Sequence, residues 1–332
     1  MPEAPPGCYA AFTMKPLPHY RSNISSFSGQ IAEVFLIAIL ASPLAGHAQS
    51  WLQPEIWAQT PAPTATLNIN YVSADTPGYA PASQQMDLYQ NATTPAGARA
   101  PVLIYMHGGA WNHGERPKSW HGFRPWLAAG FSVLNVEYRL VDVAPAPAAL
   151  QDVRCVLAWV KTNADKYQLD PERVVTYGTS AGGHLALLAG VIPAKDAMDL
   201  PQCKAQARVV AVLDYYGPYH LEPAAPGAFT SSSTKRWMGT DPKPSLEAME
   251  HAMSPSTWVH KGMPPVFQAH GDADPTVPYQ ASLELQKDLD KLGVKNVLDT
   301  VPGGGHGGWP PEQNQRVALD SLKFLQSVGV IP

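Results

Sequence analysis

The pattern of apolar and polar positions along the chain changes near residue 101. Before that point, residues 66–72 alternate polar and apolar side chains as an edge strand does, and residues 86–89 predict a second short strand. After it, runs of consecutive apolar residues alternate with stretches whose apolar residues recur every three or four positions. The first part predicts antiparallel strands, and the second predicts a parallel sheet covered by helices on both faces.

The apolar runs and the periodic stretches predict the core strands and the helices that cover them. The predicted core strands are residues 101–106, 131–136, 174–177, 209–213, 265–269 and 297–301. The predicted helices are about residues 146–167, 181–191, 279–292 and 312–328. Their regular alternation predicts an α/β fold with a mostly parallel, doubly wound sheet.

Two segments stand outside this alternation. Residues 49–63 are a Pro-rich entry to the main domain, which we expect at residues 64–332. Residues 217–262 are a long insertion that mixes Pro, Ser and Gly with large apolar residues such as Phe229 and Trp237. Long connections in compact domains are typically lids or binding loops, so we expect a cap-like insertion over the active site. The alternative is an excursion whose apolar residues serve only packing.

The N-terminus has the features of a signal peptide over residues 1–48. Lys15 and Arg21 precede an apolar run at residues 34–41, and small residues lead to a cleavage site after Ala48. We therefore expect a secreted or periplasmic protein. An uncleaved N-terminal extension is the alternative.

Removal of that segment would take Cys8 with it and leave two cysteines, Cys155 and Cys203. An even pair in an exported chain predicts a disulfide. Two buried thiols that pack as small apolar groups are the alternative.

Composition and charge exclude several classes of protein. The chain is 45% hydrophobic and 15% charged, and no stretch approaches the roughly 20 apolar residues of a membrane-spanning helix. Its net charge is −4, with acidic and basic residues scattered along the chain, so nucleic acid is not an expected partner. The 34 prolines and 26 glycines follow no fixed period, which argues against collagen-like or solenoid folds.

The strongest chemical signal is the motif G-x-S-x-G at residues 178–182, centred on Ser180. It follows the strand predicted at residues 174–177 and opens the helix predicted at residues 181–191. Small flanking residues permit a sharp turn that exposes the serine hydroxyl at the helix N-terminus. This context predicts a nucleophilic serine.

A nucleophilic serine requires a histidine as base and a carboxylate that orients the histidine. His306, flanked by five glycines, and the aspartates Asp272 and Asp274 each follow a predicted strand in the C-terminal third. Open parallel sheets place their sites at such strand ends. His270 is the rival histidine and is expected to be structural, while spacing alone leaves the choice of aspartate open.

Backbone donors for an oxyanion are expected from the Gly-rich loop at residues 107–111, which follows the strand predicted at residues 101–106. The expected donors are Gly109 and Ala110, together with Ala181 after the nucleophile. An ordinary Gly-rich turn is the alternative.

Together these motifs resemble the α/β-hydrolase superfamily, specifically the hormone-sensitive-lipase-like and BD-FAE-type feruloyl or acetyl esterases. The motifs are residues 107–111, 137–140, 178–183, 270–278 and 305–307, and the resemblance covers about residues 64–330. It implies the α/β-hydrolase fold and, by position before the Val277-Pro278 step, makes Asp274 the triad acid and Asp272 a loop-shaping residue. His-Gly-Gly-Ala-Trp in place of His-Gly-Gly-Gly favours the BD-FAE-like branch.

The resemblance and the motifs predict a secreted serine esterase, a carboxylic ester hydrolase that works through a Ser-His-Asp triad and an acyl-enzyme. Expected substrates are small-molecule or polysaccharide-linked esters of short-chain acyl, acetyl or feruloyl type, and no metal or organic cofactor is expected. Aromatic residues near strand ends are candidates for the substrate pocket: Trp111, Tyr138 and Tyr216, with Tyr215 and Trp309.

Three alternatives to an esterase stay open. Kynurenine formamidases share the His-Gly-Gly-x-Trp element, so an amide hydrolase is one of them. A serine peptidase on the same fold would use the same triad. A noncatalytic binding relative would normally lack a triad residue, and this chain lacks none.

Overall fold

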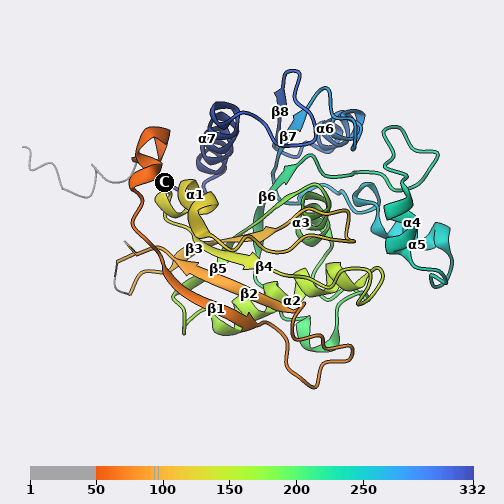
Figure 1. Ribbon diagram of the computed structural model, residues 1–332, viewed down its shortest axis with the longest axis horizontal. Helices are drawn as coiled ribbons and strands as arrows, with labels where there is room; N and C mark the ends of the chain where they lie inside the picture. Colours follow the sequence, from red (N-terminus) through yellow and green to blue (C-terminus); the bar gives the residue numbers. More distant parts are fainter. Residues whose placement is uncertain (1–49, 93, 96) are drawn as a thin grey trace, which may run out of the picture. The chain divides into compact units, whose positions relative to one another are not determined.

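The computed structural model describes residues 50–332 except residues 93 and 96, and all of them belong to one compact unit. The predicted signal peptide and Cys8 lie outside the described residues. In the described part, eight strands form one sheet in the order β1-β2-β4-β3-β5-β6-β7-β8 (Figure 1). Strand β2 pairs antiparallel with β1 and β4, and every other neighbouring pair is parallel. The predicted mostly parallel α/β sheet with an antiparallel start is confirmed.

The strands lie close to their predicted positions. They are β1 (Thr64–Asn70), β2 (Gln85–Gln90), β3 (Ala100–Met106), β4 (Ser132–Val136), β5 (Leu169–Thr179), β6 (Val209–Tyr215), β7 (Val266–Gly271) and β8 (Asn296–Val301). Alternate residues of β3 serve two separate cores: Val102 and Ile104 pack on one face of the sheet, and Leu103 packs on the other. All three are fully buried, and burial of such side chains stabilises the fold by about 1.5–3 kcal/mol each.

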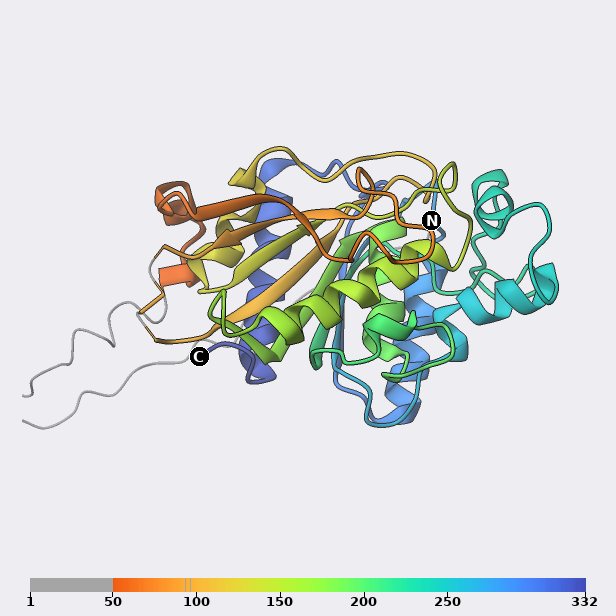
Figure 2. The same ribbon diagram turned by 90° about the horizontal axis from the view of Figure 1, so that it is seen from below.

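Helices cover both faces of the sheet. The α-helices are α1 (Arg124–Ala128), α2 (Ala148–Asn163), α3 (Ala181–Val191), α4 (Ser232–Met238), α5 (Leu246–Met253), α6 (Gln280–Leu292) and α7 (Pro311–Ser327). Buried residues of α2, α3 and α6 share one core with the sheet, and buried residues of α1 and α7 share the other. Figures 1 and 2 accordingly show α2 and α7 on opposite sides of the strands. No helix of the described part of the chain is long and apolar enough to cross a membrane.

The sequence pattern did not predict α1, α4 or α5, or any of the 3-10 helices. The 3-10 helices are η1 (Ser50–Leu52), η2 (Pro54–Gln59), η3 (Trp120–Phe123), η4 (Pro201–Cys203) and η5 (Pro255–Thr257). These elements have three to eight residues, too few for an apolar stripe to repeat. Tertiary packing rather than local periodicity therefore determines them.

The Pro-rich entry is not an irregular segment. Trp51 of η1 and Trp57 of η2 are only 2% and 4% exposed, and both pack in the core that α1 and α7 share. The Trp57 indole N–H donates to the Trp51 carbonyl oxygen at 2.9 Å. Folded structure therefore begins upstream of residue 64, where we expected the main domain to begin.

The long insertion, residues 217–262, packs largely on the body of the domain. Its residues Trp237, Met238 and Met253 are buried in the core that contains α2 and α3. Figure 1 shows α4 and α5 of this insertion beyond the end of the sheet. Two other residues of the insertion, Pro218 and Phe229, line the cavity described below.

The two cysteines of the described chain are bonded to each other. Cys155 on α2 and Cys203 on η4 form a disulfide with Cα atoms 4.7 Å apart, and 48 positions separate them in sequence. Both residues are buried. The bond ties α2 to the connection between α3 and β6.

Candidate active site

Ser180 lies at a sharp turn between β5 and α3. Its backbone has φ 55° and ψ −121°, a strained conformation for a residue with a side chain, and its N–H donates to the Tyr215 carbonyl oxygen at 2.8 Å. A Cβ at Gly178 would run into the backbone of Gly182, and a Cβ at Gly182 would run into that of Met106. The glycines of the motif are therefore required by close backbone approach, and the turn presents the serine hydroxyl above the sheet.

The structure brings Ser180, His306 and Asp274 together from three separate strand ends. His306 Nε2 lies 2.8 Å from Ser180 Oγ, and His306 Nδ1 lies 2.7 Å from Asp274 Oδ2. Asp274 is buried, whereas the imidazole side chain is 22% exposed. An ionised carboxylate accepts the Nδ1 proton, so Nε2 is free to accept the serine proton.

Asp274 is held by more than His306. Thr276 N–H and Val277 N–H donate to its Oδ1 at 2.7 and 3.0 Å, and His270 Nε2 lies 3.1 Å from its Oδ2. Burial raises the pKa of the Asp274 carboxyl, but the hydrogen bonds from His270, His306 and Thr276 outweigh burial and hold the pKa well below its usual range. The carboxylate is therefore ionised at any physiological pH.

The structure also places the two rival residues. The His270 Nδ1 lies 2.7 Å from the Ser282 hydroxyl, so its ring bridges α6 and Asp274 and does not reach the nucleophile. Asp272 is exposed and accepts the Gly303 N–H at 2.6 Å, which shapes the loop before His306. The spacing in the sequence left open which of Asp272 and Asp274 contacts the histidine. In the structure, Asp274 lies against the His306 imidazole.

The loop after β3 supplies backbone N–H groups near Ser180. Gly109, Ala110 and Trp111 all have positive φ, at 123°, 50° and 58°. A Cβ at Gly109 would collide with the His113 carbonyl oxygen, so only glycine fits there. The N–H groups of Gly109, Ala110 and Ala181 donate to no other residue of the described chain, and all three residues border the cavity that contains the Ser180 hydroxyl.

The aromatic pocket residues predicted from sequence divide into lining and packing residues. Tyr138 is fully buried, stacks on the His107 ring at 4.4 Å and donates its hydroxyl to the His107 carbonyl oxygen. It supports the loop from below, so its prediction as a pocket residue is wrong. Trp111 is also fully buried and stacks on Trp237 at 4.4 Å, and it borders the cavity that contains Ser180.

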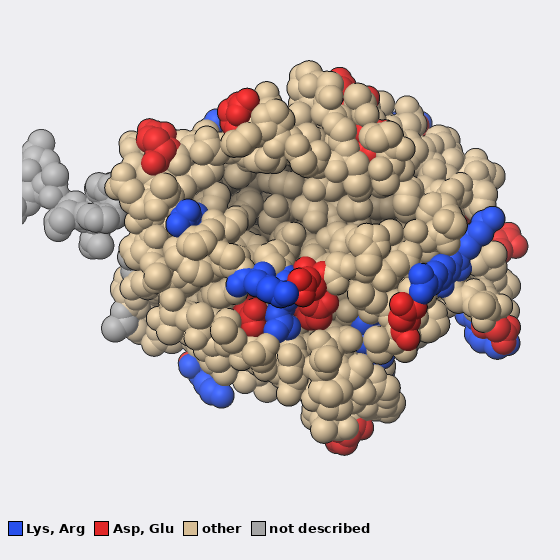
Figure 3. All heavy atoms as spheres, viewed as in Figure 1, with Lys and Arg blue, Asp and Glu red and all other residues tan. Residues whose placement is uncertain are grey.

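Two cavities meet beside Ser180. The cavity that contains Ser180 and His306, the Ser180 cavity, has a volume of about 290 Å³, and a second cavity has a volume of about 440 Å³. Thr179 and Tyr216 line both. Figure 3 shows a hollow in this face of the molecule whose visible walls carry little acidic or basic surface. The sequence did not predict most of the residues that line the two cavities. One of them, Phe229, lies in the long insertion, and the unusual length of that insertion was the only feature of the sequence that pointed to this residue.

No metal site accompanies these cavities in the part of the chain that the structure describes. Residues 50–332, apart from 93 and 96, contain no group of three or more His, Cys, Asp or Glu side chains arranged to hold a metal ion.

Comparison with known proteins finds similarity to a family model and to proteins named as esterases. A family model described as BD-FAE matches residues 86–289. Esterase LipQ of Mycobacterium tuberculosis is 32% identical over 76% of this chain and 61% of its own length. Esterase LipC of the same organism is 30% identical over 68% of this chain and 57% of its own length. The chain thus spans about three fifths of the length of these curated relatives.

Solved structures show the same fold. A truncated form of a carbohydrate esterase from gut microbiota superposes with a TM-score of 0.68 at 28% identity, over 81% of this chain and 98% of that chain. An acetyl ester-xyloside bifunctional hydrolase from Caldicellulosiruptor lactoaceticus superposes with a TM-score of 0.65 at 24% identity, over 82% and 99%.

Proposed function

This chain belongs to the BD-FAE family, and from this premise we propose that it is a serine esterase with Ser180 as its nucleophile. The observation that carries the proposal is the chain of hydrogen bonds from Ser180 through His306 to Asp274, at 2.8 and 2.7 Å. Two of its relatives, LipQ and LipC, are named as esterases, which supports the same reaction.

The first half of the reaction transfers the acyl group to the enzyme. His306 Nε2 takes the hydroxyl proton as Ser180 Oγ attacks the carbonyl carbon, and the resulting oxyanion accepts hydrogen bonds from the N–H groups of Gly109, Ala110 and Ala181. The imidazolium, stabilised by Asp274, then protonates the oxygen of the departing alcohol as the carbon–oxygen bond breaks. The acyl group remains on Ser180 as an ester.

The second half returns the enzyme to its starting state. Water attacks the acyl carbonyl while His306 takes its proton, and the same three N–H groups stabilise the second oxyanion. Ser180 Oγ leaves and regains a proton from His306, which releases the carboxylic acid. The Ser180 cavity, about 290 Å³ in volume, has room for an acyl group such as acetyl or butyryl.

The proposal includes export to an oxidising compartment, either outside the cell or in the periplasm. It rests on the signal peptide predicted at residues 1–48 and is supported by the bonded pair Cys155 and Cys203, because disulfides persist in such compartments. Fractionation of cells that express the full chain tests it. Accumulation of full-length protein in the cytosol would contradict export.

The test of the esterase proposal is hydrolysis of p-nitrophenyl acetate, butyrate, octanoate and ferulate by residues 49–332. We expect Ser180→Ala to lower kcat/KM for the acetate by about a thousandfold or more. Ser256→Ala is the matched control, because Ser256 lies outside both cavities, and it should keep full activity.

Two results would overturn the esterase proposal. Unchanged activity in Ser180→Ala would show that another group is the nucleophile. A folded parent that hydrolyses no ester of the panel, yet hydrolyses an N-formyl aniline, would identify an amide hydrolase instead.

A further inference from the structure

His270 is a fully buried histidine of β7 that contacts the triad through Asp274. Its Nε2 lies 3.1 Å from Asp274 Oδ2 and 3.1 Å from the Val277 carbonyl oxygen. Its Nδ1 lies 2.7 Å from the Ser282 hydroxyl on α6. Both ring nitrogens therefore have partners, and the ring is fixed between the triad acid and α6.

These partners determine which ring nitrogen of His270 carries the proton. A carboxylate oxygen and a carbonyl oxygen accept hydrogen bonds and do not donate them, so Nε2, which faces one of each, must be the donor. The Ser282 hydroxyl can donate, and in the neutral ring it donates to Nδ1. Ser282 is 3% exposed, so this hydrogen bond is shielded from water. The ring is thus held with its Nε2–H directed at Asp274.

The Asp274 carboxylate has a hydrogen-bond donor for each of its lone pairs. Its Oδ1 accepts the N–H groups of Thr276 and Val277 at 2.7 and 3.0 Å. Its Oδ2 lies 2.7 Å from His306 Nδ1 and 3.1 Å from His270 Nε2. Two oxygens with two lone pairs each accept four hydrogen bonds, so the two imidazoles share Oδ2.

Sharing this oxygen affects the base more than the acid. Burial raises the pKa of the Asp274 carboxyl, but the hydrogen bonds from His270, His306 and Thr276 outweigh burial and hold the pKa well below its usual range. Loss of one of them leaves the carboxylate ionised. An imidazolium, in contrast, is stabilised by the charge of its carboxylate partner, and a second N–H on the same oxygen reduces that stabilisation.

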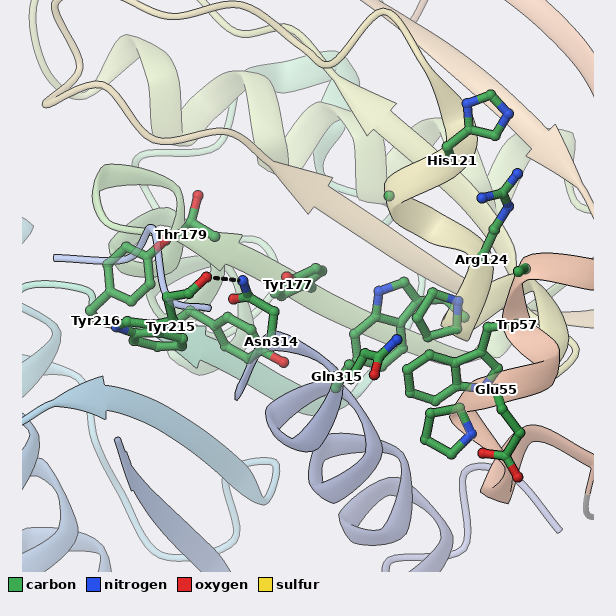
Figure 4. Close-up of a pocket in the computed structure, with 17 residues that line it drawn as sticks. Glu55, Trp57, His121, Arg124, Tyr177, Thr179, Tyr215, Tyr216, Asn314 and Gln315 are labelled. Atoms are coloured by element: carbon green, nitrogen blue, oxygen red, sulfur yellow. Dashed lines mark hydrogen bonds between the residues drawn. The ribbon is translucent and has the colours of Figure 1, made fainter. Parts of the chain in front are cut away.

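Other groups also face His270 and must be distinguished from Asp274. The Tyr279 ring, just before α6, packs edge-on against the His270 ring at 5.6 Å, and the Tyr216 ring, labelled in Figure 4, lies 6.4 Å away. The Asp214 carboxyl of β6 interacts electrostatically with His270, and burial raises the pKa of Asp214 to about 7. An effect of His270 on the pH profile must therefore be separated from the titration of Asp214.

We propose that His270 is a positioning residue of the triad: its Nε2–H, oriented by Ser282, shares Asp274 Oδ2 with His306 and so weakens the hold of His306 on a proton. The proposal rests on the proposed esterase function. Its consequence is that His306 stays unprotonated, and therefore able to act as the base, at a lower pH than it would beside Asp274 alone.

The test is the pH profile of kcat/KM for p-nitrophenyl acetate in two variants. His270→Leu removes the N–H, and His270→Gln retains a side-chain N–H. We expect His270→Leu to move the acid limb, which reports protonation of the base in the free enzyme, to higher pH by about half a unit to one unit, the effect of one net hydrogen bond. His270→Gln should keep the limb near that of the parent. A merely structural role would lower the plateau and leave the limb in place.

Two controls identify the origin of the shift. His184 is another fully buried histidine, and its Nε2 lies 2.7 Å from the Met253 carbonyl oxygen rather than from a carboxylate. His184→Leu should therefore leave the acid limb in place, whatever its effect on kcat. Asp214→Asn removes the second carboxyl that interacts with His270, and in this background His270→Leu should produce the same shift as in the parent.

A second measurement needs neither a substrate nor a folded leucine variant. The ¹⁵N chemical shifts of the histidine rings of the parent report which nitrogen carries each proton, and His270→Gln assigns the His270 signals by their loss. We expect the proton of His270 on Nε2. Where His270→Leu folds, titration of the His306 signals should give a higher midpoint than in the parent.

The outcomes that overturn the inference differ from failure of the esterase proposal. A folded His270→Leu whose acid limb stays in place or moves to lower pH overturns it. So does an equal shift in His184→Leu, loss of the shift in the Asp214→Asn background, or a His270 proton on Nδ1. If the parent hydrolyses no ester, the esterase proposal fails, and the NMR measurements still decide whether His270 acts on His306.

Discussion

Two aspartates in one loop show how the surroundings of a residue determine its chemistry. Asp272 is exposed and accepts one backbone N–H, from Gly303. Asp274 is buried, accepts hydrogen bonds from two backbone N–H groups and two imidazoles, and has its pKa held well below the usual range. Only the second environment keeps a negative charge fixed beside His306.

The two aspartates therefore form a matched pair for mutation. Asp274→Asn should lower kcat for p-nitrophenyl acetate by about a hundredfold or more, because a neutral amide neither holds the required tautomer nor stabilises the imidazolium. Asp272→Asn should keep most of the activity. Steady-state kinetics of both variants checks this prediction, with circular dichroism to verify that each variant is folded. A larger loss of kcat in Asp272→Asn than in Asp274→Asn would identify Asp272 as the triad acid.

Asp214, near the carboxyl end of β6, is a buried carboxyl that the proposed mechanism does not use. Its exposure is 2%, and it accepts the Gly217 N–H at 3.0 Å. Burial raises the pKa of Asp214 to about 7, against the opposing effects of His270 and the Gly217 N–H. The native state therefore keeps this proton in a pH range where the unfolded chain, with a pKa of about 3.9, loses it.

This difference makes stability depend on pH in a definite direction. Because the native state binds the proton more tightly, the contribution of Asp214 to the free energy of unfolding falls as pH rises from about 4 to about 7. Asp214→Asn removes that dependence, so its stability relative to the parent should rise with pH, by at most about 4 kcal/mol. Urea unfolding at pH 5, 6, 7 and 8 measures the difference. A difference that does not vary with pH would show that the carboxyl is ionised in the native state throughout.

At the scale of elements, the loop after β3 is a strained segment held by its neighbours. Its residues Ala110 and Trp111 have positive φ, which costs about 1–3 kcal/mol for each such residue. The buried Trp111 ring and the contact of His107 with Tyr138 hold the loop from below. Packing therefore maintains a backbone that points its N–H groups toward Ser180.

Opposite substitutions at adjacent positions test this loop. Gly109→Ala should lower kcat by about a hundredfold or more, because the added Cβ meets the His113 carbonyl oxygen and displaces an oxyanion donor. Ala110→Gly should keep most of the activity, because glycine adopts a φ of 50° without strain. Equal activity of parent and Gly109→Ala would remove this loop from the proposed oxyanion site.

At the scale of the whole molecule, the disulfide couples parts of the chain that are distant in sequence. Cys155 and Cys203 lie 48 positions apart, so the bond closes a loop that includes β5, Ser180 and all of α3. The cross-link restricts the unfolded chain more than the folded one, and both sulfurs lie away from the two cavities.

The double variant Cys155→Ala/Cys203→Ala should therefore lose stability and keep activity. We expect its free energy of unfolding to fall by about 2–4 kcal/mol, with kcat near that of the parent. Urea unfolding with and without dithiothreitol provides the control: reduction should destabilise the parent and leave the double variant unchanged. A parent that dithiothreitol does not affect would indicate free thiols.

The sequence by itself determined the order and type of the main elements and the position of the nucleophilic turn. Each depends on local properties: the period of apolar residues predicts β3, β6, α3 and α7, and small residues around Ser180 fit the tight turn between β5 and α3. Strand ends were also predictable, so His306 and the two aspartates were expected at the same edge of the sheet.

Only the tertiary structure decided which side chains meet there. It placed Asp274 rather than Asp272 against the imidazole, and it placed Tyr138 beneath the loop rather than in the cavity wall. It also brought Trp57, which precedes Ser180 by more than 100 positions in the sequence, to the wall of the second cavity. These outcomes depend on packing between segments that are distant in the sequence, and no local pattern of residues predicts that packing. Two aspartates or two tyrosines of similar spacing differ only in what the folded chain places around them.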